Sequence, residues 1–290
     1  MKKLLVTGCD GFLGSRIAKY YDGRYQVLCA GHSALNIENE ESVRRYVDRE
    51  RPDIAVHCAA ISDTGYAQAH PEQSYQVNVA GTKHMAAACS EVGAKLIFMS
   101  SDQIYNGCSI AGEAYDSGRD ACIEGVDDRP ASVYARHKLL AEQESSAANP
   151  DTVCLRLSWM FDLPIKGMKT NRNLLWNILC AAKESRRASF AVWDYRGVTW
   201  ARDVVEHLEK TFTFAPGVYN FGCSNSLSSY ETALEAAKLL GVGTDCIQKD
   251  DVRFLERPRN ITMSQDKTEN LGVYFTNAED SIKRCILYYK

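Results

Sequence analysis

Tyr134 and Lys138 form the pair of residues in this sequence that is best suited to proton transfer. They lie in a segment, residues 134–145, that we expect to be helical, where positions four apart share one face. A free tyrosine has a pKa near ~10 and exchanges protons poorly at neutral pH, but a neighbouring ammonium stabilises its phenolate. We therefore predict that Lys138 lowers the pKa of Tyr134 and makes it a usable general acid or base. Ser101, which follows an expected strand over residues 95–100, would hold the reacting oxygen.

Three glycines, Gly8, Gly11 and Gly14, follow an expected strand over residues 3–7 and open an expected helix. Such a unit is typical of dinucleotide binding. The glycines permit a tight turn, close approach of a pyrophosphate and packing of helix on strand, while the helix N-terminus supplies free N–H groups. The spacing is GxxGxxG, and a glycine turn without a ligand is the alternative. A tyrosine and lysine four apart also occur on ordinary helix surfaces, so this turn adds weight to the catalytic interpretation.

The end of the second expected strand bears on which cofactor is bound. In many dinucleotide-binding folds an acidic residue at this place holds the ribose 2′-hydroxyl. Residues 30–33 of this chain contain no carboxylate, and His32 and Ser33 could donate hydrogen bonds to a 2′-phosphate. We therefore expect NADP(H) to be favoured, with NAD(H) as the alternative. An exposed loop histidine without a ligand is the other interpretation of His32.

Strands and helices alternate along the first part of the chain, which indicates the α/β class and a doubly wound (Rossmann) parallel sheet. The alternation weakens after about residue 160. We expect residues 1–160 to form an NAD(P)-binding domain and residues 161–290 a smaller α/β substrate-binding lobe, with some C-terminal elements returning to the first domain. Residues 102–131 are rich in Gly, Asp and Ser and predict a functional loop. Expected strands cover residues 3–7, 25–30, 54–60, 95–100 and 152–157, and expected helices 40–51, 72–88, 134–145 and 173–184.

The composition excludes several classes of protein. The 290 residues include 34 Lys+Arg and 37 Asp+Glu, a formal net charge of −3, without the basic cluster that nucleic-acid-binding proteins show. No apolar run approaches the length of a membrane span. The 11 cysteines include no CxxC pair, which disfavours a zinc site and favours a reducing, cytoplasmic setting. We expect no metal, no nucleic acid and no membrane partner, and a homodimer stays open.

Together these motifs resemble the extended short-chain dehydrogenase/reductase family, and within it the dTDP-4-dehydrorhamnose reductase-like branch. The resemblance implies an NAD(P)-dependent oxidoreductase that reduces C4 of a nucleotide-linked 4-keto-6-deoxy sugar. Tyr134 would protonate the forming alkoxide, Lys138 would hold the nicotinamide ribose, and Ser101 would contact the substrate carbonyl. The segments that look alike cover nearly the whole chain and include residues 7–14, 57–60, 78–82, 100–107, 130–142, 156–159, 192–199 and 257–258.

The resemblance also implies binding roles for individual residues. Arg257 would hold a diphosphate, and Asp194 and Arg196 would contact substrate phosphates, with a surface ion pair as the alternative. The implied cofactor contacts are Gly8, Gly11, Phe12, Leu13, Gly14, Asn36, Ile37, Ala59, Ala60, Asn78, Tyr134 and Lys138, and the implied substrate contacts are Ser62, Asp102, Trp159, Arg196 and Arg257.

Two other functions stay open at this point. A nucleotide-sugar epimerase of the same superfamily would also need Tyr134 and Lys138, but it would turn its cofactor over internally. A regulatory subunit that binds a dinucleotide without catalysis is the second. Gln103 stands where dehydratases of this type have a glutamate, which disfavours loss of water. The segment before Tyr134 is longer than is usual in the reductase branch, carries Cys108 and Cys122, and is expected to form a lid.

Overall fold

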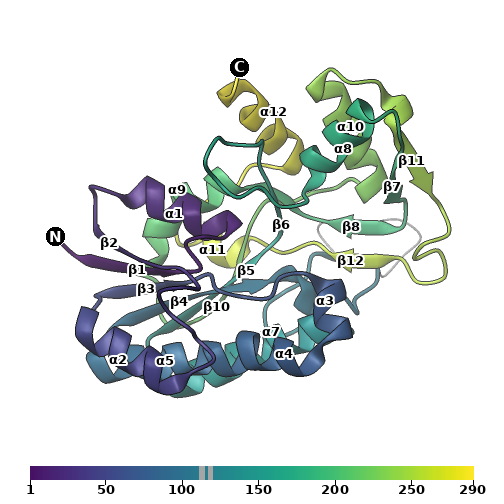
Figure 1. The fold of residues 1–290 in the computed structure, drawn as a ribbon. Coiled ribbons are helices and arrows are strands. Elements are labelled where there is room, and N and C mark those ends of the chain that lie inside the picture. Colours follow the sequence, from purple (N-terminus) through teal and green to yellow (C-terminus); the bar gives the residue numbers. More distant parts are fainter. Residues whose placement is uncertain (111–114, 117–119) are drawn as a thin grey trace. The chain divides into compact units, whose positions relative to one another are not determined.

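A six-stranded sheet forms the centre of the fold in the computed structural model, which describes residues 1–110, 115–116 and 120–290 (Figure 1). Its strands are β1 (Lys3–Thr7), β2 (Gln26–Ala30), β3 (Ile54–His57), β4 (Lys95–Ser101), β5 (Thr152–Leu157) and β10 (Gly217–Phe221). They stand in the order β10-β5-β4-β3-β1-β2, and β1 pairs parallel with both β2 and β3. The chain therefore changes winding direction between β1 and β3, which is where doubly wound sheets bind ligands.

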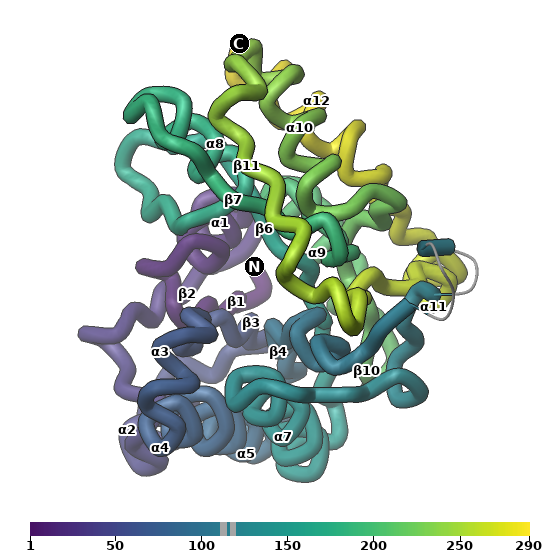
Figure 2. Tube along the Cα trace, turned by 90° about the vertical axis from the view of Figure 1, so that its right-hand side faces the viewer, coloured from purple at the N-terminus to yellow at the C-terminus, as the bar shows by residue number. Residues whose placement is uncertain are grey.

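Helices cover both faces of this sheet. Figure 1 shows α2 (Glu40–Glu50), α5 (Gly81–Val92) and α7 (Val133–Ala148) along one face and α1 on the other, and α2 packs on α5 and α5 on α7 (Figures 1 and 2). Val43 and Val47, one turn apart in the first of the three, bury against Leu5 and Leu96 of the sheet and Met85 of the next helix. The helices of this part are α1 (Phe12–Tyr21), α2 (Glu40–Glu50), α3 (Thr64–Ala69), α4 (Pro71–Tyr75), α5 (Gly81–Val92) and α7 (Val133–Ala148). The expected fold class is confirmed.

The prediction of one continuous α-helix over residues 72–88 is wrong. The structure divides it into α4, a π-helical turn over Gln76–Ala80, and α5. Such turns insert one residue into the helical ladder and often lie at functional sites. Here the turn contains Asn78, whose side chain binds the backbone of Ile61.

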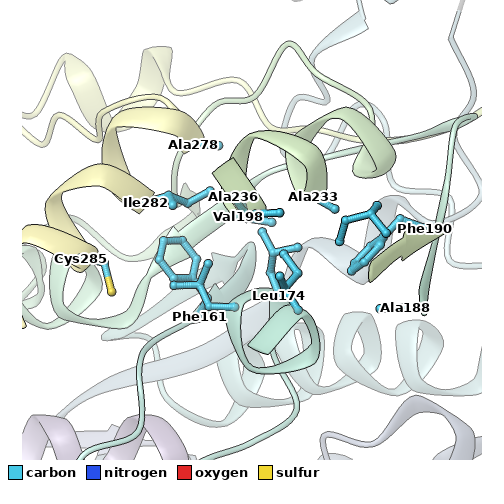
Figure 3. Close-up of a cluster of buried hydrophobic side chains, with 14 of the residues drawn as sticks. Phe161, Leu174, Ala188, Phe190, Val198, Ala233, Ala236, Ala278, Ile282 and Cys285 are labelled. Atoms are coloured by element: carbon cyan, nitrogen blue, oxygen red, sulfur yellow. The ribbon is translucent and has the colours of Figure 1, made fainter. Parts of the chain in front are cut away.

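Small parallel sheets and helices make up most of the remaining chain. Three two-stranded sheets pair β6 with β9, β7 with β11 and β8 with β12. Figure 3 shows the apolar cluster that joins several of these elements, with Phe161, Leu174, Phe190 and Ile282 buried together. The elements are β6 (Trp159–Phe161), α8 (Leu174–Lys183), β7 (Ala188–Ala191), β8 (Asp194–Arg196), β9 (Val198–Trp200), α9 (Ala201–Thr211), α10 (Ser229–Leu240), β11 (Ile247–Asp250), β12 (Arg259–Ile261), α11 (Asp266–Glu269) and α12 (Ala278–Tyr288).

The chain groups into two compact units, and each unit is built from separate stretches of sequence. Unit 1 contains residues 1–104, 130–156 and 205–219, and unit 2 contains residues 105–129, 157–204 and 220–290. Residues 205–219 lie in unit 1 with the first part of the chain. Residues 105–129, expected in the first domain, group with unit 2.

The described parts of the expected loop over residues 102–131 form a helical turn and backbone bridges to other segments of the protein. A 3-10 helical turn covers Asp102–Tyr105, and Ser109 and Cys122 form bridges with Arg259 and Met263. Residues 111–114 and 117–119 of the expected lid lie outside the described residues. Across the chain that the structure describes, no helix combines the length and the apolar character needed to traverse a bilayer.

Candidate active site

The glycine turn is a backbone cradle with no room for side chains. Gly8 has a φ of +62°, in the left-handed region that favours glycine. A Cβ on Gly8 would lie 2.8 Å from the Ala59 backbone nitrogen, and one on Gly11 would lie 2.9 Å from the Gly8 carbonyl oxygen. A Cβ on Gly14 would overlap that same carbonyl. The turn at the end of β1 thus fits closely against the end of β3.

Helix α1 begins directly after this turn, at Phe12. Its N-cap residue, Gly11, has no side chain to bond the first N–H groups of the helix, so these donors and the positive end of the helix dipole can serve an anion. Phe12 and Leu13 are buried at the start of the helix. These features fit the pyrophosphate of a dinucleotide.

The strand ends next to the turn are held by a buried polar network. The His57 ring bonds the Thr7 hydroxyl through Nδ1 at 2.8 Å and the Thr82 hydroxyl through Nε2 at 3.2 Å. Burial, with a further contribution from Lys138, lowers the pKa of His57 to about 3, so the ring is neutral. Asn78 accepts from the Ile61 N–H at 2.9 Å and donates to the Ile61 carbonyl at 3.0 Å. Asn78 and His57 therefore shape the segment that contains the half-buried Ala59 and Ala60.

A carboxylate does lie at the end of β2, contrary to the sequence-based interpretation. It belongs to Asp10 of the glycine turn: a Cβ on Gly31 would overlap the Asp10 carboxylate, so the two residues are in close contact. The sequence analysis did not identify Asp10, because the acidic residue of a dinucleotide site usually lies at the end of the second strand and Asp10 follows the first. The signal was the glycine at position 31, which leaves space for a neighbouring side chain.

The other residues expected near the adenosine half differ in exposure. His32 and Ser33 are exposed, as is Asn36, whose side chain accepts from the Glu38 N–H at 3.1 Å. Ile37 is buried, and a Cβ on Gly81 of α5 would lie 2.8 Å from its Cδ1 atom. Ile37 is thus a packing residue that fixes this loop on α5.

Tyr134 and Ser101 meet at the carboxyl end of β4. Ser132 caps α7 by accepting from the Ala135 N–H at 3.2 Å, which places Tyr134 in the first turn of the helix. The Tyr134 side chain is buried, and the side chain of Ser101 acts to lower its pKa. The Ser101 hydroxyl also accepts from the Gln103 N–H at 3.2 Å and donates to the buried Asp102 carboxylate at 3.3 Å.

The prediction that the pKa of Tyr134 is lowered is wrong for this structure. Burial raises the pKa of Tyr134, and the charge of Asp102 adds to this, whereas the side chain of Ser101 opposes it. The Lys138 Nζ atom lies 5.9 Å from the centre of the Tyr134 ring and donates instead to the Met99 carbonyl at 2.8 Å. Tyr134 is therefore protonated across the neutral range, as a proton donor requires.

Lys138 is a buried amine one helical turn after Tyr134. Only 2% of its surface is exposed, and burial lowers its pKa to about 8, although Glu142 acts to raise it. Glu142 lies one further turn along α7 and forms a buried ion pair with Arg156 of β5, with nitrogen–oxygen distances of 2.9 and 2.6 Å. The Ser100 hydroxyl donates to the same carboxylate. This network holds the helix that carries Tyr134 and Lys138 on β4 and β5.

The expected substrate contacts are divided between the units. Ser62 and Asp102 belong to unit 1, where Ser62 is exposed and Asp102 is buried. The three others belong to unit 2: Arg196 stacks over Trp159 at 4.9 Å, and the exposed Arg257 donates to the Gly107 carbonyl at 2.7 Å.

Asp194 forms a buried ion pair, rather than one at the surface, with a residue of β12. Asp194 pairs with Arg259 at 2.7 Å and accepts from the Ser229 hydroxyl. Burial acts to raise the pKa of Asp194, but the charges of Arg259 and Arg196 outweigh this effect and lower the pKa. Trp200 of the neighbouring strand β9 is buried, and its indole N–H donates to Asp162 at 2.9 Å.

Comparison with known proteins extends these similarities over the whole chain. A "dTDP-4-dehydrorhamnose reductase" of Streptomyces griseus is 32% identical over 93% of this chain and 88% of its own. "Methionine adenosyltransferase 2 subunit beta" of Xenopus tropicalis is 23% identical over 94% of this chain and 83% of its own. A crystal structure of dTDP-4-dehydrorhamnose reductase from Bacillus anthracis in complex with NADP superimposes with a TM-score of 0.84 at 21% identity, covering 99% of this chain and all of that one.

The family profile of the RmlD substrate binding domain matches residues 1–290. The match and the similar fold confirm the resemblance that the motifs indicated. The chain belongs to the RmlD substrate binding domain family.

Proposed function

We propose that this protein is an NAD(P)H-dependent reductase of a nucleotide-linked 4-keto-6-deoxy sugar, of the dTDP-4-dehydrorhamnose reductase type. The observation that carries the proposal is the buried, protonated Tyr134 beside Ser101, followed one turn later by buried Lys138. Relatives named dTDP-4-dehydrorhamnose reductase that match over most of the chain support the same reaction.

The bound nicotinamide cofactor would supply hydride to the sugar carbonyl. Gly8, Gly11 and Gly14 would receive its pyrophosphate at the start of α1, because the turn has no side chains and leaves backbone donors available. NADP(H) is the favoured cofactor, since the exposed His32 and Ser33 can donate to a 2′-phosphate and a protein of the same fold was solved with NADP. The Asp10 carboxylate reduces that preference and leaves NAD(H) acceptable.

Tyr134 would protonate the forming alkoxide at the sugar oxygen. Its raised pKa keeps the hydroxyl protonated before the reaction, and the Ser101 hydroxyl orients it. Lys138 would hold the nicotinamide ribose, since an ammonium has two further N–H donors beyond the one used by Met99. Arg196 and Arg257 of unit 2 are proposed ligands of the substrate's phosphates. The eleven cysteines are all free thiols, which fits a reducing, cytoplasmic setting.

A single assay separates this function from its alternatives. The purified protein is incubated with NADPH or NADH and a dTDP-4-keto-6-deoxy sugar, and both nicotinamide absorbance and the sugar product are followed. One cofactor oxidised for each sugar reduced is the expected result. Isomerisation of the sugar without net oxidation would show an epimerase. An increase in melting temperature with cofactor but no turnover of any sugar would show a binding subunit.

A further inference from the structure

His137 lies on α7 one residue before Lys138, and its ring contacts another helix of unit 1. The Nδ1 atom of the ring lies 2.9 Å from the hydroxyl of Ser74, which belongs to α4. The Tyr75 ring packs edge-on against the imidazole, with 5.8 Å between the ring centres. His137 therefore joins the helix that carries Tyr134 and Lys138 to the helix that leads into the π-helical turn.

The link continues from Ser74 into the π-helical turn. The Asn78 amide nitrogen donates to the Ser74 hydroxyl at 3.2 Å and to the Ile61 carbonyl at 3.0 Å. The orientation of this amide is fixed, because its oxygen accepts from the Ile61 N–H at 2.9 Å. Both hydrogens of the amide nitrogen are thus used. An unbroken series of hydrogen bonds runs from His137 through Ser74 and Asn78 to the backbone of Ile61.

The burial of Ser74 decides the direction of its bond to the histidine. The residue is 0% exposed, and its hydroxyl already accepts from Asn78. Among the residues that the structure describes, Nδ1 of His137 is the one acceptor that the hydroxyl hydrogen meets. Leaving a buried donor without an acceptor is costly, so Ser74 donates and Nδ1 accepts. His137 is therefore the neutral tautomer that carries its hydrogen on Nε2.

The surroundings of His137 favour the same neutral form. Burial, and next the charge of the adjacent Arg136, lower the pKa of His137 below its ordinary value. A charged ring would carry a hydrogen on Nδ1, and this N–H and the Asn78 amide would then both point at the Ser74 oxygen. The hydroxyl hydrogen of Ser74 would lose its acceptor. The hydrogen-bond directions and the nearby charge thus agree.

Ile61 lies between residues to which the proposed function assigns ligand contacts. Ala60, an expected cofactor contact, precedes it, and Ser62, an expected substrate contact, follows it. Because Asn78 bonds both the N–H and the carbonyl of Ile61, the series ties this short segment to α7. A displacement of about 1 Å between reacting groups can cost about 100-fold in rate. The connection between the segment and α7 therefore matters for the reaction.

We propose that neutral His137 is a positioning residue of the active site, which holds the Ile61 segment in a fixed place relative to α7 through Ser74 and Asn78. The effect on rate rests on the proposed reductase function, whereas the effect on the Ile61 backbone does not. Asparagine at position 137 should preserve the link, because its Oδ1 acceptor is as many bonds from Cβ as Nδ1 of histidine and its helix propensity is similar. Leucine offers no acceptor and should break the link.

Amide hydrogen exchange at Ile61 tests the link without any turnover. We expect the Ile61 N–H to exchange about tenfold faster in His137→Leu and in Ser74→Ala than in the wild type, and at the wild-type rate in His137→Asn. Combining Ser74→Ala with His137→Leu should add nothing, because both break the same series. His70→Leu, at an exposed histidine of unit 1, is the control and should leave the exchange unchanged. Equal exchange in His137→Leu and the wild type, or in His137→Leu and His137→Asn, would overturn the proposal.

Two further measurements test the direction of the bond and its effect on the reaction. Nitrogen NMR shifts of His137 at neutral pH should show the hydrogen on Nε2, and a hydrogen on Nδ1 would contradict the assigned direction. In the reductase assay, His137→Leu should lower kcat/KM by about tenfold and His137→Asn should restore it. A wild type that reduces no sugar would refute the proposed function, and the exchange rates would still decide whether His137 holds Ile61. Full activity of His137→Leu beside an active wild type would overturn its role in the active site.

Discussion

Replacement of Glu142 by glutamine is expected to destabilise unit 1 well beyond an ordinary surface change. Glu142 and Arg156 are 3% and 1% exposed, and their closest nitrogen–oxygen distance is 2.6 Å. Breaking a buried pair costs about 3–5 kcal/mol, because the remaining charge keeps its desolvation penalty without its counter-charge. Glutamine retains one acceptor oxygen for Arg156, so we expect the lower end, about 3 kcal/mol.

Asp151→Asn is the matched control, since Asp151 and Lys95 also lie 2.6 Å apart in unit 1 but the carboxylate is 53% exposed. Exposed pairs contribute about 0–1 kcal/mol. Urea unfolding followed by circular dichroism measures both variants. With a slope of about 3 kcal/mol per molar urea, the midpoint should fall by about 1 M for Glu142→Gln. Equal midpoints for the two variants would refute the reasoning that burial decides the strength of these pairs.

Three further predictions follow from other residues of unit 1. Asp10→Asn should raise the ratio of kcat/KM for NADPH to that for NADH by about tenfold, because it removes a negative charge beside Gly31; an unchanged ratio would place Asp10 away from the 2′ position. The kcat/KM of the free enzyme should fall above pH about 8 as Lys138 loses its proton, and Lys138→Arg, if active, should lack this decline. His57 is neutral when folded and takes up a proton only when unfolded. Stability should therefore fall below pH about 6.5 at up to about 1.4 kcal/mol per pH unit. Urea unfolding at several pH values should show a shallower fall in His57→Gln.

The sequence was sufficient to predict the sheet and the turn because their signals are local. The apolar run before Gly8 marks a buried strand, and the glycine spacing marks the turn, so β1 and α1 were expected within a few residues. The pairing of Tyr134 with Lys138 on α7 depends only on helical periodicity. Ser101 reached Tyr134 because the carboxyl ends of parallel strands lie at one edge of the sheet.

Features that depend on distant contacts were not predictable from local pattern. The pKa of Tyr134 is set by burial and not by Lys138, whose ammonium is directed to the Met99 carbonyl. The Asp10 carboxylate reaches Gly31 from a different element of the chain. The π-helical turn at Asn78 could not be predicted from residue propensities, because the Asn78 side chain bonds the backbone of Ile61, which lies in another segment.

The most direct test of the central claim compares Tyr134→Phe with Tyr219→Phe in reduction of a dTDP-4-keto-6-deoxy sugar by NADPH. Tyr219 is also a buried tyrosine of unit 1, but its hydroxyl donates to the Ala215 carbonyl. The variants differ only in which phenol is removed. We predict that Tyr134→Phe lowers kcat by about 10²–10⁴-fold while still binding cofactor, and that Tyr219→Phe keeps its rate. Full turnover by Tyr134→Phe would contradict the account of Tyr134 as the proton donor.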